Sequence, residues 1–212
     1  DKVTFDININ NKIESFILNI PGRFSVYNAL AVIGASLMQN IPIDIIKAGI
    51  KNIKGVPGRI QTIPNNKGFN VIVDYAHTPD GLENIIKAVR EFTKGRVITI
   101  FGCGGDRDRK KRAIMGEISA KLSDYTIITS DNPRSEVPES IIDEIEIGVR
   151  PITNYYEKIT SRKEAIFKGV AMAKPKDSII IAGKGHEDYE IFADRTIHFD
   201  DTEVAREALE EL

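Results

Sequence analysis

Four short clusters of glycine, charged and polar residues contain most of the side chains in this chain that could do chemistry. Arginine guanidinium groups bind carboxylates or phosphates through paired hydrogen bonds, and carboxylates accept hydrogen bonds from ammonium groups. The clusters carry both kinds of group, so together they suit a ligand with charges of both signs. They are residues 74–80 (DYAHTPD), 102–108 (GCGGDRD), 130–134 (SDNPR) and 183–187 (GKGHE).

The candidate ligand contacts are two arginines, Arg107 and Arg134, and two acids, Asp131 and Glu187. Pro133 restricts the residue before it to extended backbone, so Asp131 and Arg134 should project from a stiff loop. Two alternatives stay open on composition alone. Arg107 lies in a run of mixed charge that is typical of a solvated surface, and the four charged groups could pair with each other instead of with a ligand.

The glycines of the second cluster should let backbone N–H groups approach a ligand closely and should tolerate positive φ. Gly102, Gly104 and Gly105 do not complete the dinucleotide-binding pattern G-x-G-x-x-G, because Arg107 occupies the place of the third glycine. An ordinary tight turn is the alternative interpretation. Lys184 in the fourth cluster is not a P-loop lysine, since G-x-x-x-x-G-K-[ST] occurs nowhere in the chain.

The sequence predicts no metal site. His77 and His186 lie in two of the clusters but His198 does not, so we expect loop or packing roles for the histidines. The single cysteine, Cys103, excludes an internal disulfide and Cys-rich zinc sites. Nothing in its surroundings marks Cys103 as a nucleophile beyond its glycine-rich loop.

Strands that alternate with helices should position these clusters. Such a pattern is typical of an α/β fold, here a Rossmann-like, mostly parallel sheet flanked by helices. Because parallel strands end at the same edge of a sheet, the four clusters should converge at the carboxyl edge, where open α/β sheets bind ligands. The expected strands are 59–64, 70–74, 97–101, 125–129, 152–156 and 178–182, with a hairpin of 189–192 and 196–199; the expected helices are 79–92 (capped by Thr78), 109–122, 138–148, 162–173 and a last one capped by Thr202.

The beginning of the chain follows a different α+β pattern. Residues 3–9 and 13–20 alternate around the turn Asn10-Asn11, and apolar residues at helical spacing follow at 27–38 and 43–53. Lys54–Gly58 is rich in Gly and Pro and breaks regular structure. We therefore expect residues 1–57 to form the end of one domain and residues 58–212 to form a second domain.

Composition excludes several classes of protein. The 212 residues carry 29 Lys and Arg against 31 Asp and Glu, a net charge of −2, which argues against a nucleic-acid-binding protein. Hydrophobic residues make up 42% of the chain, as in ordinary globular proteins. No apolar run is long enough to cross a membrane, and the first residues do not form a signal peptide. We expect a cytoplasmic protein with neither nucleic-acid nor membrane partners.

At these residues the chain resembles the Mur ligase family. The matching pieces appear in family order along essentially the whole chain, which makes the set specific although no single piece is. They are residues 22–31 (GRFSVYNALA), 58–59 (GR), 74–79 (DYAHTP), 102–107 (GCGGDR), 131–134 (DNPR) and 183–187 (GKGHE).

The resemblance implies an ATP- and Mg²⁺-dependent ligase of peptidoglycan precursor synthesis, and so of cell wall biogenesis, cell shape and cell division. Residues 1–57 would end its central ATP-binding domain and 58–212 would form its last domain, while the P-loop and the magnesium ligands would lie outside this chain. ATP would phosphorylate the D-glutamate side carboxylate of a UDP-N-acetylmuramoyl-dipeptide, and the amine of meso-diaminopimelate would attack the acyl phosphate. We expect a monomer, inactive alone, with a hinge at Lys54–Gly58.

The resemblance also implies roles for individual residues. Asp131-Asn132-Pro133-Arg134 would recognise meso-diaminopimelate, with Arg134 binding the distal carboxylate that lysine lacks. Arg107 would bind a carboxylate, Gly183 would make a backbone contact, and Glu187 would hold an ammonium group. Three further residues match family positions near ATP, and are assigned to adenine, the γ-phosphate and ribose in this order: Asn28, Arg59 and Asp74.

Two other classes of protein compete with this interpretation. A nucleotide-dependent oxidoreductase is disfavoured by the missing third glycine and by the lack of a well-placed acid about 20 residues further on. A stand-alone amino-acid-binding or nucleotide-binding module of Rossmann-like fold, without catalysis, remains an alternative.

Overall fold

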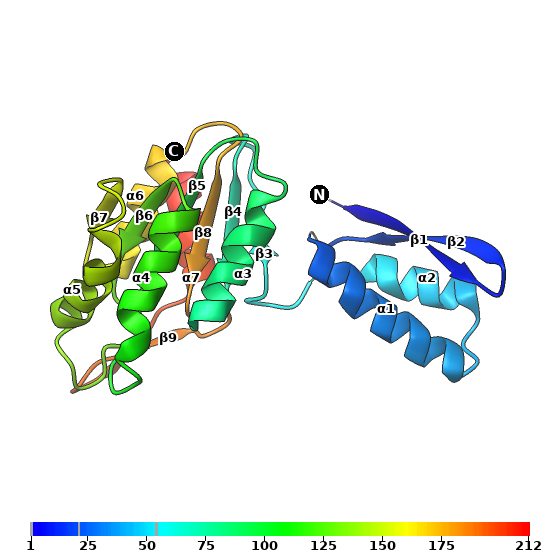
Figure 1. Cartoon of the computed structure of the whole chain (residues 1–212), viewed down its shortest axis with the longest axis horizontal. Coiled ribbons are helices and arrows are strands. Elements are labelled where there is room, and N and C mark those ends of the chain that lie inside the picture. The colour runs from blue at the N-terminus through cyan, green and yellow to red at the C-terminus, as the bar shows by residue number, and fades with distance from the viewer. Residues whose placement is uncertain (1, 21, 54) are drawn as a thin grey trace. The chain divides into compact units, whose positions relative to one another are not determined.

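The chain divides into two compact units, Asp1–Val56 and Pro57–Leu212. The structure is a computed structural model that describes residues 2–20, 22–53 and 55–212, without the side chains of Arg23 and Phe24. Lys54, the first residue of the expected hinge, lies outside the described residues. Each unit has its own apolar core, and Figure 1 shows the elements of both.

The first unit is an antiparallel hairpin packed with two helices. Strands β1 (Val3–Ile9) and β2 (Lys12–Leu18) pair around Asn10 and Asn11, which both adopt the left-handed conformation that Asn tolerates in a two-residue turn. The alternating apolar residues of β2 pack with helices α1 (Arg23–Met38) and α2 (Ile43–Asn52). The core residues shared by these elements are Phe16, Leu18, Ala29, Ile33, Ile46 and Ile50.

The second unit contains a six-stranded sheet in the order β3-β4-β8-β5-β6-β7. All neighbouring strands are parallel except β3, which runs antiparallel to β4. The register aligns the strand ends: Ala182 pairs with both Asp74 and Phe101, and Phe101 pairs with Ile128. The loops that follow these strands therefore start at the same level. The strands are β3 (Gln61–Thr62), β4 (Asn70–Asp74), β5 (Val97–Phe101), β6 (Tyr125–Ile128), β7 (Tyr156–Lys158) and β8 (Ser178–Ala182).

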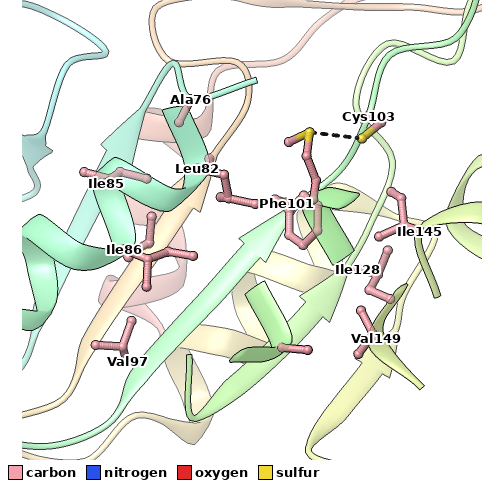
Figure 2. Packing of buried hydrophobic residues seen from close by; sticks show 14 of the residues in the cluster. Ala76, Leu82, Ile85, Ile86, Val97, Phe101, Cys103, Ile128, Ile145 and Val149 are labelled. Carbon is pink, nitrogen blue, oxygen red and sulfur yellow. Dashed lines mark hydrogen bonds between the residues drawn. The ribbon is translucent and has the colours of Figure 1, made fainter. Parts of the chain in front are cut away.

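Helices cover both faces of this sheet. One face packs against α3 (Pro79–Arg90), α4 (Lys110–Leu122) and α5 (Pro138–Val149), and the other against α6 (Arg162–Met172) and α7 (Asp201–Glu210). Figure 1 shows α3 and α4 in front of the sheet and α7 behind it. Figure 2 shows Leu82, Phe101 and Ile128 in the first of these cores. The expected Rossmann-like α/β fold is confirmed.

Several expected elements differ in detail from the observed ones. The strand expected at 152–156 is wrong, because Ile152 N donates to Val149 O and so belongs to the turn that ends α5; β7 begins only at Tyr156. Thr202 does not cap α7, since the Asp200 side chain accepts from the N–H groups of Thr202 and Glu203. The strand expected at 59–64 is reduced to β3, because Ile60 has a φ of 44° that takes it out of extended backbone.

The remaining expectations agree closely with the structure. The Thr78 side chain accepts from Gly81 N and caps α3, with Pro79 at the first helical position. Strands β9 (Tyr189–Ile191) and β10 (Thr196–His198) form the expected antiparallel hairpin. Among the described residues, no helix has both the length and the apolar character that a membrane crossing requires.

Candidate functional site

The four polar clusters meet in one pocket at the carboxyl edge of the sheet, with a volume of about 520 Å³. Each cluster begins where a parallel strand ends, and the aligned register of β4, β8, β5 and β6 brings these starting points together. Convergence of the clusters, predicted from strand direction alone, is thus what the structure shows. The lining residues are Tyr75, His77, Thr78, Gly102, Cys103, Gly104, Arg107, Asp108, Lys111, Asp131, Asn132, Arg134, Gly183, Glu187 and Tyr189.

The second and third clusters are held together by backbone contacts. Gly105 N donates to Asn132 O at 2.9 Å, and Arg134 Nη1 donates back to Gly105 O at 2.8 Å. A Cβ atom at Gly105 would lie 1.9 Å from Pro133 O, so only glycine permits this approach. Glycine is therefore needed here for contact between two loops. The expected positive φ is wrong for these glycines, and belongs instead to Asp106 and Arg134, each with a φ of 53°.

Arg107 and Arg134 both line the pocket without a carboxylate partner. Among the ion pairs of the described residues, none involves Arg107, Arg134, Asp131 or Glu187, so the alternative in which these four groups pair with each other is excluded. Arg134 makes its described side-chain hydrogen bonds through Nη1 alone, to Gly105 O and Asn132 O. Its other guanidinium donors have no hydrogen-bond partner among the described residues.

The two acids of the pocket have different surroundings. Asp131 is only 8% exposed, its Oδ1 accepts from Asn132 N at 2.7 Å, and its charge acts on the buried cations Arg162 and Lys184. Glu187 is half-buried, and its Oε2 accepts from Asn132 Nδ2 at 2.9 Å. Of the two candidate ammonium acceptors, Glu187 is therefore the more accessible one, and its described side-chain partner is a neutral amide.

A buried ion pair supports the floor of the site. Arg162, the first residue of α6, donates from Nε and Nη2 to the two carboxylate oxygens of Asp201, at 2.7 Å each. Its remaining hydrogen bonds reach Ser130 O and Ala182 O, just after β6 and at the end of β8. One guanidinium group thus ties two helices and two strand ends together beneath the pocket.

A second arginine supports the glycine-rich loop. The fully buried Arg112 guanidinium donates to Glu136 at 2.7 and 2.8 Å and to Glu144 at 2.9 Å, and Nη2 contacts Gly104 O at 3.4 Å. Glu136 in turn accepts from Asp106 N at 2.7 Å. The hydrogen bonds from Arg112 lower the pKa of Glu136 to about 2, so this carboxylate stays charged at neutral pH.

The three residues assigned to ATP come from different parts of the chain. They differ in how exposed their side chains are and in whether these already have partners. The guanidinium of Arg59 lies 4.8 Å above the Tyr75 ring, is exposed and has no ion-pair partner among the described residues, which suits a phosphate. Asp74 is 7% exposed, and its carboxylate oxygens accept from two backbone N–H groups, those of Ile60 and Ala76. Asn28 is an exposed residue of α1, in the first unit. The assignment of these residues to ATP stays a prediction.

Two of the histidines contact an aromatic ring, and the third forms an exposed ion pair. The rings of His77 and His186 lie 4.6 and 5.2 Å from the Tyr75 ring, and His198 pairs with Glu203 at 2.6 Å. Within the described part of the chain, no three His, Cys, Asp or Glu side chains are grouped so that they could hold a metal ion. Burial raises the pKa of the Cys103 thiol to about 12, which leaves it protonated and inert.

Sequence reasoning missed three residues of the site. Lys111 and Tyr189 line the pocket from α4 and β9, and no motif marks either of them. Lys184 was considered only as a P-loop residue, yet it lies fully buried behind the pocket. A lysine between two glycines, directly after an apolar strand, was a usable signal, since burial of a lysine requires dedicated partners.

The fold and pocket together define a class: an α/β domain whose carboxyl edge carries a pocket lined by charges of both signs, at the place where open α/β sheets bind ligands. Comparison with known proteins makes the class specific. Residues 58–185 match the family model described as Mur ligase, glutamate ligase domain. The chain belongs to the Mur ligase family, whose members are ATP-dependent ligases that form amide bonds.

Several similar relatives share one name. The chain is 52% identical over 210 residues to UDP-N-acetylmuramoyl-L-alanyl-D-glutamate–2,6-diaminopimelate ligase 1 of Clostridium acetobutylicum, covering 98% of this chain and 43% of the relative. The corresponding ligase of Clostridium botulinum is 51% identical over 212 residues, covering 99% and 44%. A solved structure of a ligase with this name matches with a TM-score of 0.76 at 33% identity, covering 98% and 42%. The chain thus spans less than half the length of these relatives.

Proposed function

We propose that this chain is the part of a meso-diaminopimelate-adding ligase that binds the incoming amino acid and presents its amine for amide formation. The proposal rests on charged groups of the pocket that have no ion-pair partner among the described residues. Arg107 and Arg134 line the pocket without carboxylate partners, and Glu187 lines it as well. The names of the relatives, each a 2,6-diaminopimelate ligase, support this choice of amino acid.

The chemistry of the pocket matches the difference between meso-diaminopimelate and lysine. Diaminopimelate carries a second carboxylate where lysine ends in an amine-bearing methylene, and a guanidinium binds a carboxylate through two parallel hydrogen bonds. Arg134 is already oriented by its bond to Gly105 O, so little side-chain freedom is lost on binding. Bound lysine would leave Arg134 without this partner, which disfavours lysine.

We propose the remaining steps of the reaction from the chain's membership of the Mur ligase family. When bound, ATP supplies the phosphoryl group that activates the D-glutamate side carboxylate of the UDP-N-acetylmuramoyl-dipeptide. Arg59 would meet its phosphates, Asn28 its adenine and Asp74 its ribose, while Mg²⁺ would be held outside this chain. Residues 1–57 would complete an ATP-binding domain, and Lys54–Gly58 would act as the hinge that lets residues 58–212 align the amine. The ligase would act in the cytoplasm, as a monomer, in peptidoglycan precursor synthesis.

Isothermal titration calorimetry with meso-diaminopimelate and with L-lysine tests the amino-acid assignment. The wild-type chain should bind meso-diaminopimelate more tightly than lysine by about 10-fold or more, the value of one charge-assisted bidentate contact. In Arg134→Ala this preference should disappear, because the distal carboxylate loses its partner while Glu187 is retained.

Arg150→Ala is the matched control, because Arg150 is an exposed arginine at the end of α5 that does not line the pocket. It should leave both affinities unchanged. A wild-type chain that does not distinguish the two amino acids, or an Arg134→Ala variant that keeps the full preference, would contradict the proposed function.

A further inference from the structure

We infer that Lys184 is a positioning residue for ligand binding: from behind the pocket it fixes the side-chain amide of Asn132, and the amide in turn fixes Glu187. The inference rests on the proposed function, in which Glu187 receives an ammonium group of the amino acid. Lys184 itself is fully buried and is not among the residues that line the pocket.

Two donors determine how the Asn132 amide is oriented. Lys184 Nζ lies 2.9 Å from Asn132 Oδ1, and Ile191 N lies 3.0 Å from the same oxygen. An ammonium group and a backbone N–H can only donate, so the oxygen of the amide must face them. The amide nitrogen then necessarily faces the other way, where its Nδ2 donates to Glu187 Oε2 at 2.9 Å.

The same ammonium group holds the pocket wall. Lys184 Nζ also donates to Tyr189 O at 2.6 Å, and Tyr189 lines the pocket at the start of β9. One buried cation therefore joins β9, the loop after β6 and the loop after β8, to which Lys184 and Glu187 both belong. Removal of the ammonium group would leave the Tyr189 carbonyl and one acceptor position on Asn132 without their partner.

Burial of this lysine is costly, which argues for a specific use. Burial lowers the pKa of Lys184, and the nearby charge of Asp131 acts in the opposite direction. Among the described residues, no carboxylate forms an ion pair with it at 4.0 Å or less. An apolar residue of similar length would fill the space without that desolvation cost but could not orient the amide. The lysine's donors thus account for its presence.

Lys184→Met tests the inference, because methionine has a similar length and no donor. In the wild-type chain the Asn132 side-chain amide should give a single pair of NMR resonances, protected from solvent exchange by its bonds. In Lys184→Met these resonances should shift and lose protection, and the affinity for meso-diaminopimelate should fall by about 10- to 100-fold, the range for a displaced charged hydrogen bond. Lys121→Met, at an exposed lysine of α4, is the control and should change neither.

A double-mutant cycle separates positioning from a general loss of structure. Because Lys184 acts through Glu187, Lys184→Met should have little further effect on affinity when Glu187→Gln is already present. Additive losses would overturn the inference, and so would unchanged Asn132 resonances in Lys184→Met. A wild-type chain that binds no diaminopimelate would overturn the proposed function, whereas shifted Asn132 resonances would still support the contact chain from Lys184.

Asn132→Asp keeps the test valid if Lys184→Met does not fold. Its carboxylate still accepts from Lys184 and Ile191, but the donor to Glu187 is replaced by a second negative charge, which repels the Glu187 carboxylate from its observed position. The affinity for meso-diaminopimelate should again fall. An unchanged affinity in this variant would overturn the inference.

Discussion

Asp131 and Glu187 carry the same charge and line the same pocket, but their partners differ. The charge of Asp131 acts on the buried cations Arg162 and Lys184, whereas Glu187 accepts from a neutral amide. A half-buried carboxylate that has no cationic partner gains more from the positive charge of a ligand than one that lies close to cations. At the scale of single residues, therefore, hydrogen-bond partners, and not residue type, decide which acid can receive a ligand's ammonium group.

Glu187→Gln should reduce the affinity for meso-diaminopimelate and for L-lysine alike, each by about 10- to 100-fold, because both ligands present an ammonium group to the lost charge. Titration calorimetry of both amino acids checks this. Glu210→Gln, at an exposed position in the last helix, should leave both affinities unchanged. A loss confined to diaminopimelate would argue that Glu187 does not hold the shared ammonium group.

Residue types and spacing predicted the members of the pocket better than their partners. The arginines and acids are visible in the sequence because they follow apolar strand runs, in short loops that also contain glycine or proline. That Asn132 contacts Lys184, Ile191 and Glu187 together depends on chain segments more than 50 residues apart, as in the separation of 52 between Asn132 and Lys184. No local pattern encodes such contacts.

At the scale of elements, the ends of the strands determine the site. Continuous apolar runs made β5 and β8 easy to locate, because strands buried on both faces carry no alternation. The element boundaries that were predicted wrongly depend on single polar contacts or turns. Asp200 caps α7 in place of Thr202, and the turn after α5 takes Ile152 out of β7. Competing caps and turns of similar strength are not distinguished by periodicity.

Two ion pairs between α6 and α7 provide a stability test at this scale. Arg162–Asp201 is completely buried, whereas Lys163–Glu207 joins the same helices with both side chains about half-exposed. Asp201→Ala should lower the free energy of unfolding by about 3–5 kcal/mol, because it leaves a buried guanidinium without its counterion. Glu207→Ala should lower it by at most about 1 kcal/mol. Urea unfolding followed by circular dichroism measures both, and equal losses would contradict the role given to Arg162.

At the scale of the whole chain, two units with separate cores carry different parts of the proposed function. The family match covers residues 58–185, within the unit that contains the pocket. Parallel strand direction predicts that the loops starting at residues 74, 102, 130 and 183 lie at one edge of the sheet. The observed order β4-β8-β5-β6 and the aligned register then bring them together. The pocket is thus a consequence of topology, whereas the selectivity proposed for it depends on a few side chains.

A crystal structure of the chain with bound meso-diaminopimelate tests the central claim most directly. The account predicts that the amino acid occupies the pocket at the carboxyl edge, with one carboxylate hydrogen-bonded by the Arg134 guanidinium and an ammonium group against the Glu187 carboxylate. An amino acid bound elsewhere on the domain, or bound in the pocket without contact to either Arg134 or Glu187, would contradict it.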